Sequence, residues 1–102
     1  MLRTKSQRRK LCPACPVARV ADLLGDTCSL LIIRDVIEKP RRFGALQESL
    51  SGISTRTLTS KLRQLEKEGL LGRKGLQYTI TKKGAALNDV IGAMRAYGKK
   101  YL

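Results

Sequence analysis

Apolar positions recur at intervals of three and four residues through the first half of this chain, which is the period of an amphipathic helix. The pattern predicts three helices, over residues 17–24, 29–39 and 43–50. Gly25 ends the first and Pro40 ends the second, because glycine suits a helix C-terminus and proline cannot continue a helix. The second helix is apolar on nearly every side, so we expect it at the centre of the core.

A fourth helix is predicted between Ser54, a favoured N-cap residue, and Gly69, a favoured stop. Leu58, Leu62 and Leu65 fall at i, i+4 and i+7 and so share one apolar face. The opposite face carries hydroxyl, amide and guanidinium groups, which can meet base edges in a DNA major groove, and the acidic residues are held back to the last turn. With the helix before it, this segment forms a helix-turn-helix. An ordinary solvated helix face would have the same polar composition.

The period changes after Gly69. Residues 70–81 alternate in their second half, and two glycines bracket a basic turn, which predicts a β-hairpin. Thr81 can cap a last helix, whose long apolar stripe comprises Leu87, Val90, Ile91, Met94, Tyr97 and Tyr101. The expected fold class is therefore mainly α with a small β-hairpin (α+β), in the element order of a winged helix-turn-helix.

Charge narrows the choice of partner. The 102 residues hold 21 Lys and Arg against 8 Asp and Glu, a formal net charge of +13 at pH 7, which favours a polyanion. The chain has no Trp, one Phe and no apolar run near the length of a membrane span, so a membrane is the weaker partner. The basic start is not followed by the apolar segment of a signal peptide, and we expect a cytoplasmic protein.

Several short motifs resemble those of the HxlR family of winged-helix transcription regulators, within the broader MarR-like grouping. The resemblance runs from Cys15 to about Gly98 and rests on Cys15-Pro16-Val17, Asp22-Leu23-Leu24-Gly25, Leu30-Leu31-Ile32-Ile33-Arg34-Asp35, Arg41-Arg42-Phe43 with Leu46, Gly52-Ile53-Ser54, Leu58-Thr59, Leu62-Arg63-Gln64-Leu65-Glu66, Gly69-Leu70, and Tyr78-Thr79-Ile80-Thr81 before Gly84.

This resemblance implies a homodimer built by the N-terminal and C-terminal helices. Two recognition helices would enter successive major grooves of a palindromic operator on double-stranded DNA, and two wings would reach the flanking backbone. Such regulators are more often repressors, and no cofactor is implied. The chain then divides into a basic N-terminal arm with a CxxC motif over residues 1–16 and a winged helix-turn-helix domain, ending in a dimerisation helix, over residues 17–102.

Two positions depart from the family pattern. Cys28 stands where the family usually has Trp, which removes a large aromatic side chain from the expected core or dimer region. The hairpin turn around Arg73 and Lys74 is shorter than the usual wing, which argues against deep contact with the minor groove. A short wing can still hold phosphate through these two cations.

We assign the DNA surface to three segments. The fourth helix contributes Ser54, Thr55, Arg56, Thr57, Thr59, Ser60 and Arg63, the approach to the third helix contributes Arg41 and Arg42, and the hairpin contributes Arg73 and Lys74. Arg56 is the preferred base reader, because a guanidinium can grip guanine O6 and N7 together. The other cations, with Lys61 and Lys67, would meet phosphate. Solubility explains these surface cations equally well.

Cys12 and Cys15 form a CxxC motif, and three uses of it stay open. In the use we prefer, Cys15 matches the family's N-terminal cysteine and is a candidate redox sensor, with Cys12 as its resolving partner. The nearby Arg8, Arg9 and Lys10 favour a reactive thiolate. A cysteine pair from each subunit could instead hold zinc across a dimer, although we expect no metal. In the third use, Cys15 only packs.

The sequence contains no catalytic constellation, because it has no His, no Gly-rich phosphate loop and only scattered carboxylates, so we do not expect an enzyme. Two alternatives to a sequence-specific regulator remain. A nonspecific chromatin-like DNA-binding protein would also be strongly basic, but it does not explain the polar pattern of the fourth helix. A thiol-redox or zinc-binding protein would centre on Cys12 and Cys15.

Overall fold

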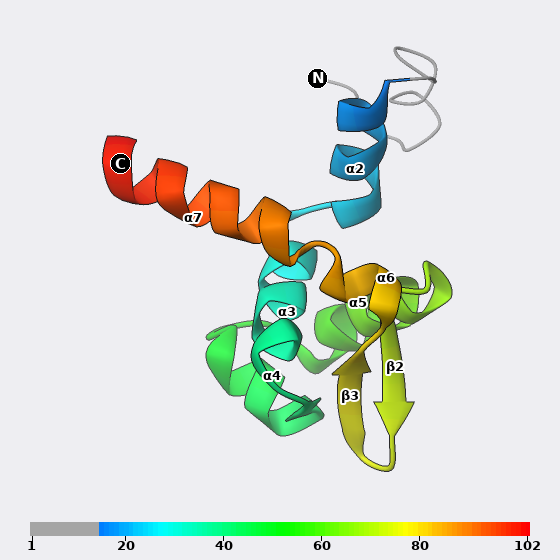
Figure 1. Cartoon of the computed structure of the whole chain (residues 1–102). Coiled ribbons are helices and arrows are strands. Elements are labelled where there is room, and N and C mark those ends of the chain that lie inside the picture. The colour runs from blue at the N-terminus through cyan, green and yellow to red at the C-terminus, as the bar shows by residue number, and fades with distance from the viewer. Residues whose placement is uncertain (1–14) are drawn as a thin grey trace.

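The computed structural model describes residues 15–102. Its elements, in chain order, are α2 (Pro16–Leu24), α3 (Thr27–Glu38), β1 (Arg41–Arg42), α4 (Phe43–Ser49), α5 (Thr55–Lys67), β2 (Leu71–Lys74), β3 (Gln77–Ile80), α6 (Lys82–Ala85) and α7 (Asn88–Tyr101). Figure 1 shows α3 in the middle of the molecule, with α4, α5 and the β2–β3 hairpin around it. The helices α2 and α7 extend away from the N-terminal end of α3. The expected basic arm lies outside the described residues, apart from Cys15 and Pro16.

The core is built around α3. Ile32, Ile33 and Val36 of this helix are almost completely buried, which confirms that the predicted second helix is the central one. They lie in one apolar cluster with the leucine face of α5, which is buried as its spacing predicts. The remaining buried members of the cluster are Leu46, Leu50, Leu70, Leu71, Tyr78, Leu87 and Ile91.

The predicted hairpin is confirmed, but it belongs to a three-stranded antiparallel sheet with the order β1-β3-β2. Gly75 has φ +63°, so the tight turn between β2 and β3 uses a backbone conformation that glycine adopts most easily. The third strand is β1, where Arg41 pairs with Tyr78 and Arg42 pairs with Gln77. The sequence did not predict it, because two residues are too few to show a strand period.

The sequence predicted one continuous last helix, and this is wrong, because the segment forms two helices, α6 and α7. Thr81 caps the start of the first of them as expected. The Thr81 hydroxyl accepts a hydrogen bond from the Gly84 backbone N–H at 3.0 Å and donates to the Gly69 carbonyl at 2.7 Å. This contact fastens α6 to the start of β2. A Cβ atom on Gly84 would lie 2.3 Å from the Leu70 carbonyl oxygen, so the close approach requires glycine. After α6 the chain turns, and α7 begins as a separate helix.

Two helices keep much of their apolar surface outside the core. In α2, Val17 is 78% exposed, whereas Leu23 and Leu24 pack partly against the core. In α7, only Ile91 in the first turn is buried, together with Leu87 directly before the helix. The stripe predicted on the last helix is therefore divided between a buried beginning and an exposed continuation.

Candidate nucleic-acid interface

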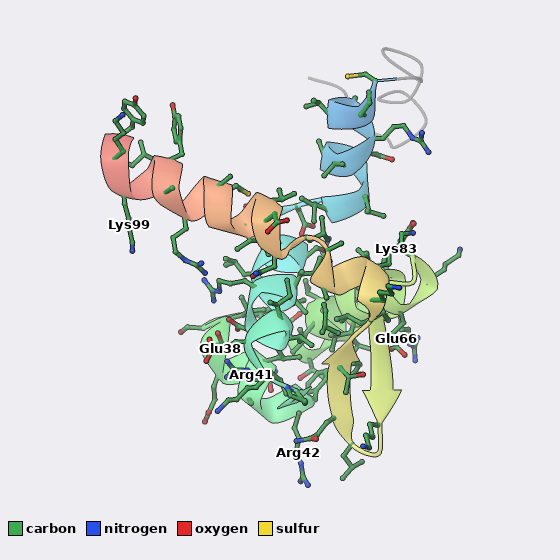
Figure 2. The ribbon with its side chains drawn as sticks, viewed as in Figure 1. Glu38, Arg41, Arg42, Glu66, Lys83 and Lys99 are labelled. Atoms are coloured by element: carbon green, nitrogen blue, oxygen red, sulfur yellow. The ribbon has the colours of Figure 1, made fainter. Side chains whose placement is uncertain are left out.

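Contacts at both ends fix the position of α5. At the N-terminus, Ser54 is the predicted cap, and its Oγ accepts a hydrogen bond from the Thr57 backbone N–H at 3.1 Å. At the C-terminus, Gly69 takes φ +78°, which ends the helix as predicted. The ammonium group of Lys83, which Figure 2 labels on α6, donates to the Glu68 carbonyl oxygen at 3.0 Å and satisfies a terminal acceptor.

The solvent side of α5 carries the residues that the sequence assigns to DNA. A shallow, open hollow on this side is lined by Arg56, Thr59, Ser60, Arg63, Gln64 and Lys67. The first turn of the helix contains no acidic residue. Glu66, in the last turn, lies 3.4 Å from the Arg73 guanidinium, so part of its charge is already compensated. The arrangement therefore presents a continuous donor-rich and positively charged helix face.

The hydroxyl groups near the start of this face make hydrogen bonds within the protein. Gln47 Nε2 of α4 donates to Thr55 Oγ1 at 3.1 Å, and Ser54 Oγ donates to Thr57 Oγ1 at 2.9 Å. Thr59 Oγ1 donates to the Thr55 carbonyl oxygen at 2.7 Å. No local sequence pattern points to Gln47, because only the packing of α4 against α5 brings it to Thr55.

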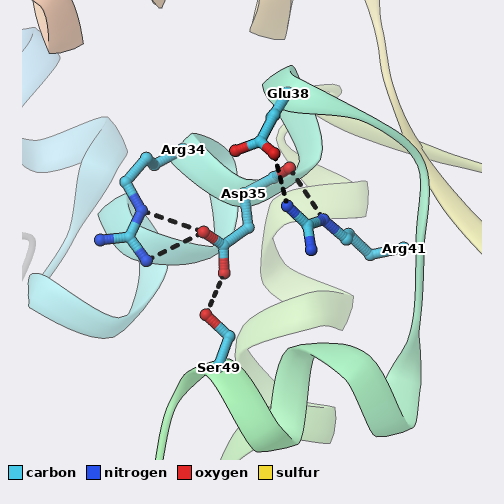
Figure 3. Close-up of polar contacts among 5 residues, drawn as sticks. All are labelled: Arg34, Asp35, Glu38, Arg41 and Ser49. Atoms are coloured by element: carbon cyan, nitrogen blue, oxygen red, sulfur yellow. Dashed lines mark hydrogen bonds and ion pairs between the residues drawn. The ribbon is translucent and has the colours of Figure 1, made fainter.

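The neighbouring residues Arg41 and Arg42 have different environments. Arg41 is half-buried, where its Nε donates to the Asp35 carbonyl oxygen at 3.2 Å and its guanidinium lies 3.4 Å from Glu38 (Figure 3). Arg42 is exposed, and Figure 2 shows it pointing away from the body of the molecule. In the free protein, Arg41 thus joins α3 to β1, and Arg42 is the cation that faces solvent.

The hairpin holds one of its two predicted cations in place. Arg73 Nη2 donates to the Tyr78 hydroxyl at 2.7 Å, and its guanidinium carbon lies 4.6 Å from the centre of the Tyr78 ring. This combination of hydrogen bond and cation–π contact restrains the Arg73 side chain. Lys74 is exposed on the next position of β2. Arg73 therefore offers a restrained charge and Lys74 an exposed one.

Lys61, which the sequence assigned to phosphate, forms an ion pair with Asp26. The other oxygen of this carboxylate caps α3, because it accepts a hydrogen bond from the Ser29 backbone N–H at 2.9 Å. Partial burial acts to raise the pKa of Asp26, but the hydrogen bonds from Lys61 and Ser29 and the Lys61 charge outweigh it, so the pKa is lowered. Asp26 thus joins the start of α3 to the recognition-helix candidate.

The structure places Cys15 directly before α2, where it is half-buried, and Cys28 half-buried in α3. Cys12 lies outside the described residues, so the geometry of the CxxC motif is untested. Within residues 15–102, no three His, Cys, Asp or Glu side chains gather as a metal site. In the same range, no helix is long and apolar enough to cross a bilayer.

Comparison with known proteins agrees with this fold. The HxlR-like helix-turn-helix family matches residues 23–102. The transcriptional regulator sll1512 of Synechocystis sp. is 37% identical over 95 residues, covering 86% of this chain and 70% of the relative. Quinone-bound YodB of B. subtilis is 33% identical, with a TM-score of 0.77 over 85% of this chain and 100% of YodB. A MarR-family regulator from Porphyromonas gingivalis, 26% identical, has a TM-score of 0.81 over 87% and 94% of the two chains. This chain therefore belongs to the HxlR-like helix-turn-helix family of transcriptional regulators.

Proposed function

We propose that this regulator is a homodimer that binds double-stranded DNA in a sequence-specific manner and represses transcription by occupying an operator. The exposed face of α5 is the observation that supports the proposal most strongly. Arg56 lies in its first turn, exposed and without an ion pair to any described residue, and the first turn has no acid. A guanidinium in this position can bind guanine through two hydrogen bonds.

Cations on other elements would hold the DNA backbone. Arg42 of β1 and Lys74 of β2 both pair in register with Gln77 of β3, so the three side chains share one face of the sheet. All three are exposed. Contacts from such side chains to phosphate would set the orientation of the protein without reading sequence.

The exposed part of α7 supports self-association. Val90, Met94, Tyr97 and Tyr101 recur at the spacing of one helix face, and Tyr97 and Tyr101 are 62% and 61% exposed. Exposed Val17 lies on α2, which extends from the same end of α3 as α7 (Figure 1). We assign the dimer interface to these two helices. A twofold dimer would require a palindromic operator.

The thiol at Cys15 lies at the N-terminus of α2 and therefore at the proposed interface. YodB, a relative of this chain, has been solved with a bound quinone and after diamide treatment. We propose that Cys15 senses oxidants or electrophiles, with Cys12 as a resolving thiol. Oxidation of two thiols to a disulfide would transfer two protons and two electrons to the oxidant. The new disulfide would change how α2 packs at the proposed interface. Equal operator affinity before and after diamide would refute this sensor.

Selection from a pool of random DNA duplexes at two salt concentrations tests the DNA-binding proposal. The expected result is a palindromic motif with half-sites about one helical turn apart. In the same assay, Arg56→Ala should weaken operator binding by about 1–3 kcal/mol and relax the preference at one base position. Recovery of no motif, with binding that collapses as salt rises, would identify a nonspecific DNA-binding protein instead.

A further inference from the structure

Hydrogen bonds within the protein determine how each threonine at the start of α5 can meet DNA. Thr59 Oγ1 lies 2.7 Å from the Thr55 carbonyl oxygen. A carbonyl oxygen can only accept, so the Thr59 hydroxyl must give its proton to this bond. Thr59 then offers only lone pairs to a base, which makes it a hydrogen-bond acceptor on the exposed helix face.

Thr55 has the opposite polarity. Gln47 Nε2 donates to Thr55 Oγ1 at 3.1 Å, and this bond occupies a lone pair and leaves the hydroxyl proton available. Thr57 Oγ1 likewise accepts from Ser54 Oγ, 2.9 Å away, and keeps its own proton. Together with Arg56, the first turn therefore offers donors, while Thr59 offers an acceptor one turn later.

Gln47 can impose this polarity because the helix that carries it is fastened to the core. Leu46, the residue before Gln47, is completely buried. Ser49 Oγ donates to Asp35 Oδ2 at 2.5 Å, and Arg34 donates to the other oxygen of the same carboxylate at 2.9 Å (Figure 3). Asp35 is only 6% exposed. These contacts fix α4 and hold the Gln47 amide against Thr55.

We propose that Gln47 is a specificity-determining positioning residue, which makes Thr55 a donor so that each operator half-site carries a base other than cytosine against Thr55 and adenine or cytosine against Thr59. In the major groove, guanine and thymine present only acceptors, cytosine presents only an amino donor, and adenine presents both the acceptor N7 and an amino donor. Thr59 follows Thr55 by about 6 Å along the helix, at 1.5 Å per residue, so it faces a neighbouring base step. The inference rests on the proposed role of α5 as the recognition helix.

Selection from random duplexes with the full chain and its variants tests this inference. The unsubstituted chain should select against cytosine at one position and should select adenine or cytosine one or two steps away. Gln47→Glu replaces the amide donor with a carboxylate that only accepts, so the Thr55 proton would turn towards it. The preference at the first position should then shift at least threefold away from guanine and thymine and towards cytosine. Gln47→Met, which has no donor, should flatten that preference.

Thr59→Val removes the acceptor at nearly constant volume, and it should reduce the preference at the second position by about 2- to 10-fold. Ala45→Glu is the matched control for charge, because it adds a carboxylate at another exposed position of α4. It should weaken binding to all duplexes equally and leave the selected motif unchanged. Thermal unfolding of each variant verifies that it is folded at the assay temperature.

The outcomes separate this inference from the proposed function. If the unsubstituted chain selects a motif and neither Gln47 variant changes any base preference, Gln47 does not determine specificity. A uniform loss of affinity, with the motif intact, would show that Gln47 has only a structural role and would also overturn the inference. If the unsubstituted chain selects no motif, the proposed sequence-specific function fails with it.

Discussion

The hydrogen bond from Ser49 to buried Asp35 allows a quantitative prediction for Ser49→Ala. The bond is 2.5 Å long and its acceptor belongs to a carboxylate that is only 6% exposed. A hydrogen bond to a charged group contributes about 1.5–3 kcal/mol to stability. Arg34 keeps its contact with the other oxygen, and Ser49 lies at the surface, where water can reach the vacated position. We therefore expect the lower end of that range, about 1.5 kcal/mol.

Thermal and urea unfolding measure this loss directly. In a domain of this size, 1 kcal/mol corresponds to a shift of roughly 4–8 °C in the unfolding midpoint. Ser49→Ala should therefore unfold several degrees below the unsubstituted protein, with an unchanged dependence on urea. Ser51→Ala is the matched control, because Ser51 is exposed in the turn after α4. Equal midpoints for the two variants would refute the argument that Asp35 depends on Ser49.

Three further predictions concern other contacts. Gly84→Ala should destabilise the domain by about 1–3 kcal/mol, because the new Cβ meets a backbone carbonyl oxygen. Gly98→Ala is the control, because a Cβ at this position of α7 meets open space and should not destabilise the domain. Urea unfolding compares the two variants. Tyr97→Lys should give a monomer in light scattering at micromolar concentration, and a dimer that persists would exclude Tyr97 from the interface. Asp26 has a lowered pKa, so its stabilising effect is complete above its ordinary pKa and is lost as pH falls through the lowered value. Asp26→Asn should accordingly be less stable near neutral pH and approach the unsubstituted protein in acid, and parallel curves at every pH would contradict this.

Local patterns predicted the features that depend on local physics. The leucine spacing of α5 identified its buried face, and Ser54 and Gly69 identified its ends, because helix periodicity and capping act within a few residues. Thr81 was identified as a cap for the same reason. The nearby break before α7 was missed, since the tight packing of Gly84 against β2 depends on residues distant in sequence.

Other features required the tertiary arrangement. Arg41 and Arg42 are adjacent and chemically identical, yet one is half-buried against Glu38 and the other is exposed. Pairing of β1 with β3 places them on opposite faces of the sheet, and no sequence pattern reveals that pairing. Likewise, Lys61 forms its ion pair with Asp26 only because the fold brings these two distant residues together. The fold and the bounds of the candidate recognition helix were thus predictable, while the environments of individual cations were not.

The ion pairs within the fold also bear on how salt would control binding. Each phosphate neutralised by a protein cation releases counterions and adds about 0.9 to the slope of log affinity against log salt on duplex DNA. Lys61, Arg41 and Arg73 already lie beside carboxylates, so their charges contribute less to that release than the exposed Arg42 and Lys74. The slope of log affinity against log salt would therefore depend on which cations the fold leaves uncompensated on the proposed DNA-binding face. The net charge of +13 does not determine it.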